Sequence, residues 1–201
     1  SPDGAYVVYA ADATTDEVYE LFAAASDGLS APVKLSGTLV AGGDVSRPNF
    51  LDRLVWFGSG RVVYAADALQ DELFSAPIDG SAAPVRLNAN MTSGGDVQDD
   101  ILVSADGLTV LYRADQVADE VFELWRVPID RSATPDRVNL PLPPGGDVMS
   151  ARFLARGNRI LYRADQDVDQ VFELYSLRLL PRTPRGPTVP PPISGTVTRQ
   201  L

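Results

Sequence analysis

The stretch "YRADQVADEVFELW" at residues 112–125 returns as "YRADQDVDQVFELY" at residues 162–175, with ten of fourteen positions identical. More distant copies begin at Val7 ("VVYAADATTDEVYELF") and at Val62 ("VVYAADALQDELFSAP"). The tyrosines that mark the four copies are separated by 55, 48 and 50 residues: Tyr9, Tyr64, Tyr112 and Tyr162. A repeat period of this size predicts a fold built from four similar units.

Turn signals divide each copy in the same way. A turn precedes the marked segment as "SPDG", "GSG", "SADG" or "RGN", and the first three units end with "GGDV". The segments between the turns are rich in Val, Leu, Tyr and Phe and are too short for helices. We therefore predict four short strands in each unit.

The segments "VVYAA" and "VLYRA" are apolar almost throughout, which indicates strands that are buried on both faces. The blades of a β-propeller have this property, because each packs between two neighbours, and a four-stranded blade takes about 40–50 residues. A sandwich would not require such a repeat. The sequence therefore predicts an all-β fold, a β-propeller of four blades at about 1–44, 45–96, 97–147 and 148–180.

The first unit lacks the innermost strand that would precede Ser1. The other three units have theirs around Phe50–Phe57, Ile101–Ser104 and Ala151–Ala155. Three sources for the missing strand stay open: the C-terminal "ISGTVTRQL", a second chain, or further sequence of a longer propeller. Four blades make an unusually small ring, so we expect a larger ring or assembly.

The "SPDG" turn of residues 1–4 and the "SADG" turn of residues 104–107 are each followed by a strand, an "AD" hairpin and an acidic residue before an aromatic strand. This pattern resembles the TolB-type propeller repeat over residues 1 to about 178, although "GSG" and "RGN" depart from the family's aspartate-glycine turn. The resemblance implies the propeller fold and an exported protein. It implies either an interaction module or the gating domain of a peptidase, because such blades serve both roles.

Composition argues against several classes of function. The net charge of −10 opposes binding to nucleic acid, and no apolar run is long enough to span a membrane. Without His or Cys, and with Lys34 as the sole lysine in an expected strand, the chain offers no serine–histidine or serine–lysine pair. We therefore predict that it is not an enzyme, although a carboxylate pair for glycoside hydrolysis stays open among its 27 acidic residues.

Two acidic patterns recur. The first, D-x-x-x-D-E or its variant, is assigned mainly to turn structure, because Asp side chains bond to nearby backbone amides. A calcium site is the alternative. Its members are Asp12, Asp16, Glu17, Asp67, Asp71, Glu72, Asp115, Asp119, Glu120, Asp165, Asp169 and Gln170.

The second pattern is "GGDV", which places Asp44, Asp96 and Asp147 at intervals of 52 and 51 residues. Links between blades cross one face of a propeller toward its axis, so these carboxylates are the candidate cation site, with calcium as the candidate ion. The alternative is that the paired glycines allow a tight turn, which Asp caps.

The aromatic residues of the repeat are predicted to pack between the blades rather than to bind a ligand. Arg113 and Arg163 replace the alanines of the first two copies, Ala10 and Ala65, and we expect each arginine to pair with a neighbouring carboxylate.

The tail, residues 181–201, is rich in proline and basic, and it ends in the strand-like "TVTRQL". It is either an arm that docks on an acidic sheet edge of another subunit, through Arg182, Arg185 and Arg199, or a linker. Together these features predict a non-catalytic module that binds protein, including copies of itself through the C-terminal arm, and needs no cofactor. The resemblance to TolB-type blades implies a location outside the cytoplasm: extracellular, at the cell surface or in the periplasm. The alternatives are a gating domain of a prolyl oligopeptidase-like or tricorn-like peptidase, or a cation- or sugar-binding propeller.

Overall fold

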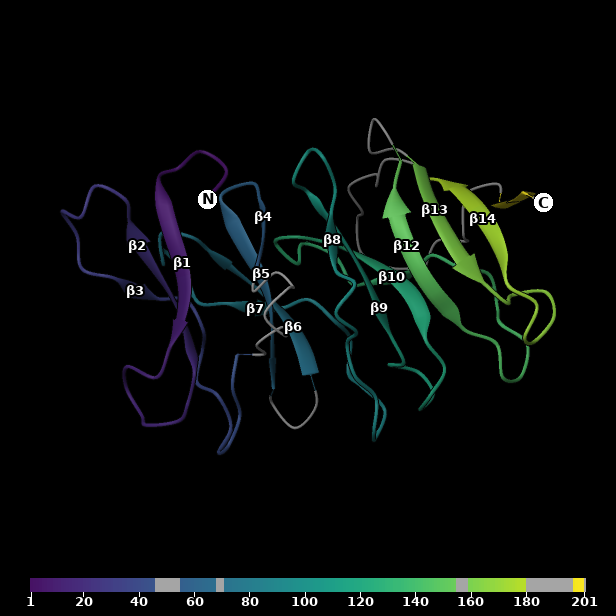
Figure 1. Ribbon diagram of the computed structural model, residues 1–201, viewed down its shortest axis with the longest axis horizontal. Coiled ribbons are helices and arrows are strands. Elements are labelled where there is room, and N and C mark those ends of the chain that lie inside the picture. Colours follow the sequence, from purple (N-terminus) through teal and green to yellow (C-terminus); the bar gives the residue numbers. More distant parts are fainter. Residues whose placement is uncertain (46–54, 68–70, 155–158, 180–196, 201) are drawn as a thin grey trace.

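The computed structural model describes residues 1–45, 55–67, 71–154, 159–179 and 197–200. Their strands form four antiparallel sheets, which Figure 1 shows side by side in one row, from the first sheet (purple) to the fourth (yellow-green). The predicted all-β fold is confirmed. No helix within these ranges is long and apolar enough to cross a membrane.

Each sheet is a meander in which the strands lie in sequence order. Sheet 1 contains β1 (Tyr6–Ala11), β2 (Glu20–Ala25) and β3 (Val33–Lys34). Sheet 2 contains β4 (Trp56–Gly58), β5 (Arg61–Asp67), β6 (Asp71–Pro77) and β7 (Val85–Arg86). Sheet 3 contains β8 (Leu102–Val103), β9 (Thr109–Ala114), β10 (Glu123–Pro128) and β11 (Asp136–Arg137). Sheet 4 contains β12 (Val148–Phe153), β13 (Arg159–Ala164), β14 (Glu173–Arg178) and β15 (Val197–Gln200).

The core consists of three layers, one between each pair of neighbouring sheets. In β9, Val110 and Tyr112 pack against sheet 2, whereas Leu111 packs against sheet 4. Because successive side chains of a strand point to opposite faces, a continuous apolar run fills both layers at once. The prediction of burial on both faces is thus confirmed for this strand.

The marker tyrosines of sheets 2 to 4 belong to the buried layers between the sheets. Tyr64, Tyr112 and Tyr162 are fully buried, and burial raises the pKa of each phenol. Aromatic rings on neighbouring strands stack beside them, as for Tyr162 and Tyr175 with ring centroids 5.3 Å apart. The predicted packing role is confirmed for these tyrosines.

Among the described residues, sheet 1 has three strands and no inner strand, as the sequence predicts. The inner strands of sheets 2 to 4 lie near the predicted segments, although β12 starts three residues earlier than expected, and residues 50–54 lie outside the described ranges. Isolated bridges join Val45 to Ala66 and Val97 to Ala114. The residue after each "GGD" therefore already belongs to the next sheet.

The end of the tail lies where the sequence did not place it. β15 pairs with β14 as the outer strand of sheet 4 in its own chain, with Tyr175 opposite Arg199. Within the chain, it does not complete sheet 1. The physical reason is register: the "TVTRQL" strand supplies the outer position that "APVKL", "APVRL" and "TPDRV" fill in the other sheets.

Candidate interaction surfaces

The three aspartates of "GGDV" each accept a hydrogen bond from the sheet that they leave. The acceptor is Oδ1 each time, and the donor is the backbone amide 25 residues earlier, at or just before the start of the second long strand. The pairs are Tyr19 to Asp44 at 2.6 Å, Asp71 to Asp96 at 3.0 Å and Phe122 to Asp147 at 2.8 Å. Each carboxylate thus fixes the end of one sheet to the link toward the next.

The aspartates of "ADQ" bind the same links from the sheet that follows. Asp115 accepts the amide of Asp96 at 2.6 Å and that of Glu120 at 3.0 Å, and Asp165 accepts the amides of Asp147 and Gln170 in the same way. Glu120 and Gln170 have positive φ angles of 58° and 64°, a conformation that costs energy for residues other than glycine. The carboxylates stabilise these hairpins, so the turn interpretation is confirmed for Asp115 and Asp165.

The ring of carboxylates proposed from "GGDV" is not assembled in the described part of the chain. No group of three or more acidic side chains there is close enough to hold a metal ion. Asp44, Asp96 and Asp147 lie on three different links between sheets, and each accepts a hydrogen bond from its own backbone amide. Burial raises the pKa of Asp147, with the charges of Asp165 and Asp169 adding to the effect.

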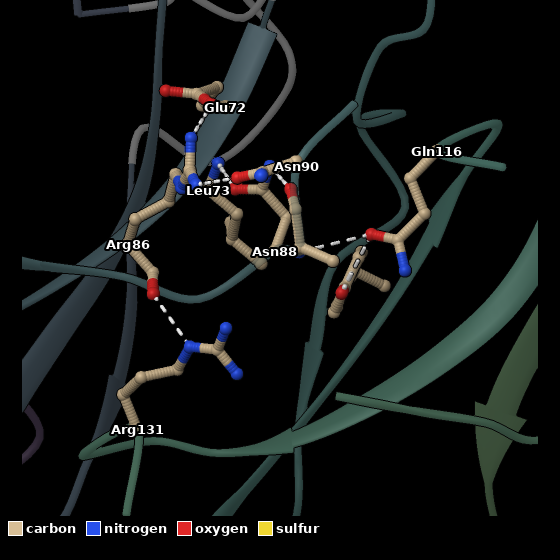
Figure 2. A network of polar contacts seen from close by, with 9 residues as sticks. Glu72, Leu73, Arg86, Asn88, Asn90, Gln116 and Arg131 are labelled. Carbon is tan, nitrogen blue, oxygen red and sulfur yellow. Dashed lines mark hydrogen bonds and ion pairs between the residues drawn. The ribbon is translucent and has the colours of Figure 1, made fainter. Parts of the chain in front are cut away.

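A second set of polar side chains fixes the segment after the outer strand to the neighbouring strand of the same sheet, and the sequence analysis missed it. Asn88 and Asn139 are fully buried, and each accepts the backbone amide 15 residues earlier, that of Leu73 or Leu124. Ser36 does the same for Leu21. Figure 2 shows Asn88 directed at Leu73.

Gln116 and Gln166 extend this set across the layer. Gln116, labelled in Figure 2, accepts through Oε1 the amide of Ala89, which follows β7 of sheet 2, and the hydroxyl of Tyr112 in its own sheet, both at 3.2 Å. Gln166 Oε1 accepts the amide of Leu140 at 3.0 Å and the hydroxyl of Tyr162 at 2.8 Å. We call each such pair of tyrosine and glutamine a latch. The first and last residues of the "YRADQ" stretch therefore form the latch.

A cation and a glutamate pair across the two outer strands of sheets 1 to 3. The nitrogen–oxygen distance is 2.6 Å in every pair: Lys34 with Glu20, Arg86 with Glu72, and Arg137 with Glu123. In sheet 4 the register places Arg199 opposite Tyr175, as Arg137 lies opposite Trp125. Arg199 therefore occupies the cation position of the repeat, whereas Arg182 and Arg185 lie outside the described residues.

The two substituted arginines differ. Arg113 pairs with Asp100 at 3.0 Å, as predicted, and also donates to the carbonyl of Val148 in sheet 4. Arg163 lies over the ring of Phe172, 4.6 Å from its centroid, and is exposed. Arg113 thus reaches the following sheet, and Arg163 sits at the same strand position in a sheet that no described sheet follows.

A cavity of about 210 Å³ lies between the turns of sheets 1 and 2 and is lined in part by Asp3, Phe57 and Arg61. Asp3 accepts hydrogen bonds from the Ser1 hydroxyl and the Ala5 amide, which hold its pKa below the ordinary value. Arg61 donates to Ser75. Asp3 thus already stabilises its turn, and Arg61 already bonds to the neighbouring strand of its own sheet.

The two ends of the row expose residues that are buried in its interior. Leu174 in sheet 4 is 44% exposed, whereas its counterparts in sheets 1 to 3 are at most 1% exposed: Leu21, Leu73 and Leu124. Val7 in sheet 1 is 56% exposed, whereas its counterparts in sheets 2 to 4 are fully buried: Val62, Val110 and Ile160. We name the first surface of a sheet its leucine face and the second its tyrosine face, after the marker tyrosine beside each valine.

Every described layer joins the leucine face of one sheet to the tyrosine face of the next. Within the described ranges, sheet 4 therefore ends the row with an open leucine face, and sheet 1 begins it with an open tyrosine face. Figure 1 shows these two sheets at opposite ends of the molecule.

Comparison with known proteins supports this architecture. The crystal structure of puromycin hydrolase matches with a TM-score of 0.54 at 14% sequence identity, over 89% of this chain and 26% of that one. The fold is that of β-propeller blades. At this identity the likeness shows the fold alone, and the chain spans about a quarter of the length of that structure. No family model matches the sequence. No curated protein matches it either.

Proposed function

We propose that these four blades are a non-catalytic module for binding protein and for assembly, which acts through its open end faces. The observation that carries this proposal is the exposure of Leu174 and Val7 at positions that are buried at every internal layer. Apolar side chains that are exposed at positions buried in every internal layer are typical of a surface that another protein covers.

The recurring acidic residues support the same proposal. They bond to backbone amides at the hairpins and links, so their repetition is accounted for by architecture. Work outside the cytoplasm is part of the proposal and rests on the resemblance to TolB-type blades.

Photo-crosslinking in the producing cell tests this function. A photoreactive phenylalanine analogue replaces Leu174 in one variant and Val7 in another. Val117, a 65% exposed residue in the hairpin of sheet 3, is the matched control. We expect protein adducts from positions 174 and 7 and none from position 117. Equal labelling at all three positions, or no adduct at either end, would overturn the proposal.

A second candidate function is the gating propeller of a larger peptidase, favoured by the structural match to part of puromycin hydrolase. This role requires a separate hydrolase segment with a G-x-S-x-G nucleophile motif. Sequencing the native reading frame beyond these residues decides between the two roles. Such a segment in the same frame would favour gating, and a frame without one would exclude it for this chain.

A further inference from the structure

The open tyrosine face and the open leucine face complement each other. Inside the chain, Leu124 of sheet 3 lies in one layer with Ile160 and Tyr162 of sheet 4. The same residue types stand at the open ends: Leu161 and Leu174 on sheet 4, and Val7 and Tyr9 on sheet 1. We propose that a second copy of this chain occupies each end, with the leucine face of sheet 4 on the tyrosine face of sheet 1. The proposal rests on the proposed function.

The match is directional. Two leucine faces never meet in the described layers, and neither do two tyrosine faces. The contact is therefore head to tail. Two copies form a closed ring when both of the junctions between them form. Such a ring has eight blades, within the range of about 4–8 that propellers adopt.

The polar groups at the two ends also fit the layer between sheets 1 and 2. In the sequence, Ala68 of the second unit aligns with the latch glutamine of the third and fourth units. In this layer, the hydroxyl of Tyr64 donates instead to the carbonyl of Leu35, which follows Lys34, at 3.4 Å. Sheet 1 likewise has Ala13 at the glutamine position and Tyr9 at the tyrosine position.

Gln200 supplies the matching acceptor on sheet 4. It follows Arg199, which holds the register position of Lys34, so its backbone carbonyl stands where that of Leu35 stands. In the head-to-tail contact, the Tyr9 hydroxyl of one copy donates to this carbonyl of the other.

Charge favours the same contact. Arg113 reaches across to the following sheet, and Arg163 at the same position in sheet 4 is exposed. Asp12 on sheet 1 is exposed, whereas its counterpart Asp165 is buried. The junction therefore brings the end that exposes Arg163 toward the end that exposes Asp12.

The test is the molar mass of the 201-residue chain across a concentration series, measured by sedimentation equilibrium. We expect a reversible species of twice 21.6 kDa. Leu174→Glu and Val7→Glu should each raise the dissociation constant at least about tenfold, because each places a charge in the apolar junction. Val117→Glu makes the same change at an exposed site away from both ends and should leave the dissociation constant unchanged.

Mixing the two single variants tests the direction of the contact. Val7→Glu keeps an intact leucine face, and Leu174→Glu keeps an intact tyrosine face, so an equimolar mixture should form heterodimers through one native junction. A chain that stays monomeric, open polymers, or a dimer that only one of the two variants weakens would overturn the proposal. Circular dichroism of each variant checks that the sheets remain folded.

These outcomes are separable from those of the crosslinking test. Adducts at positions 174 and 7 with a different protein, together with a monomeric purified chain, would sustain the interaction module and overturn self-association. Absence of any adduct at the ends would overturn the module itself.

Discussion

At the scale of single residues, polar side chains in this protein mainly replace water as partners of buried backbone amides. Asn139 is fully buried, accepts the amide of Leu124 at 2.8 Å and donates to the carbonyl of Leu140 at 2.8 Å. An amide that loses such a partner inside the protein carries the full cost of desolvation. These residues therefore contribute to stability although they take no part in the apolar layers.

Asn139→Ala should lower the free energy of unfolding by about 1–3 kcal/mol, because it leaves the amide of Leu124 without an acceptor. Asn90→Ala is the control, since Asn90 is exposed and bonds to exposed Arg86. Its cost should stay within about 0.5 kcal/mol. Urea denaturation measures both, and equal losses would contradict the assigned role of Asn139.

Asp147 gives a prediction for pH. Burial raises its pKa above the ordinary 3.8, so the folded protein binds this proton more tightly than the unfolded chain does. The stability that Asp147 contributes is then highest below pH 3.8 and decreases as the pH rises through the folded pKa.

Asp147→Asn removes this titration and keeps an oxygen for the amide of Phe122. The unfolding free energy of the variant minus that of the wild type should therefore increase as the pH rises from below 3.8 to neutral. Denaturation at a series of pH values measures the difference. A difference that is constant or decreases with rising pH would show that Asp147 is not held in this way.

At the scale of elements, the sequence predicted the strands because their signals are local. "VVYAA" and "VLYRA" are apolar runs between turns, and β1, β5 and β9 lie on them. The open inner position of sheet 1 followed from comparing the four copies. Neither inference needed a partner far away in the chain.

Non-local partners are what the sequence could not supply. Gln116 bonds to Ala89, 27 residues earlier, and β15 pairs with β14 across a long connection. The latch could have been found by comparing the four copies, because its glutamine is present in the two copies with "ADQ" and absent from the two with "ADA". For Arg199, the signal is alignment of "TRQL" with the "VKLS" of the first unit.

The latch of sheet 4 predicts coupled energies. Tyr162→Phe and Gln166→Ala each remove one side of the hydrogen bond of 2.8 Å, and each should cost about 1–3 kcal/mol of unfolding free energy. Since they share this contact, the double variant should lose less than the sum of the two single losses. A double-mutant cycle measures the difference, and strict additivity would contradict a working latch.

At the scale of the whole molecule, three layers join four blades into an open row with different ends. The chain has no cysteine, so spin labels at two introduced cysteines attach nowhere else. Val7 and Leu174 are exposed, and they lie on the two end faces. The distance between them separates an open row from a closed ring of four blades.

Pulsed electron paramagnetic resonance on the doubly labelled Val7→Cys, Leu174→Cys chain measures that distance. Mixing the labelled chain with an excess of unlabelled protein ensures that pairs of labels in different copies do not contribute. Because packed sheets lie about 10 Å apart and three layers separate the ends, the open row predicts a distance on the order of 30 Å or more. A distance near 10 Å that survives the dilution would mean that sheets 1 and 4 of one chain pack together. That result would contradict the open row and, with it, both proposed roles of the end faces.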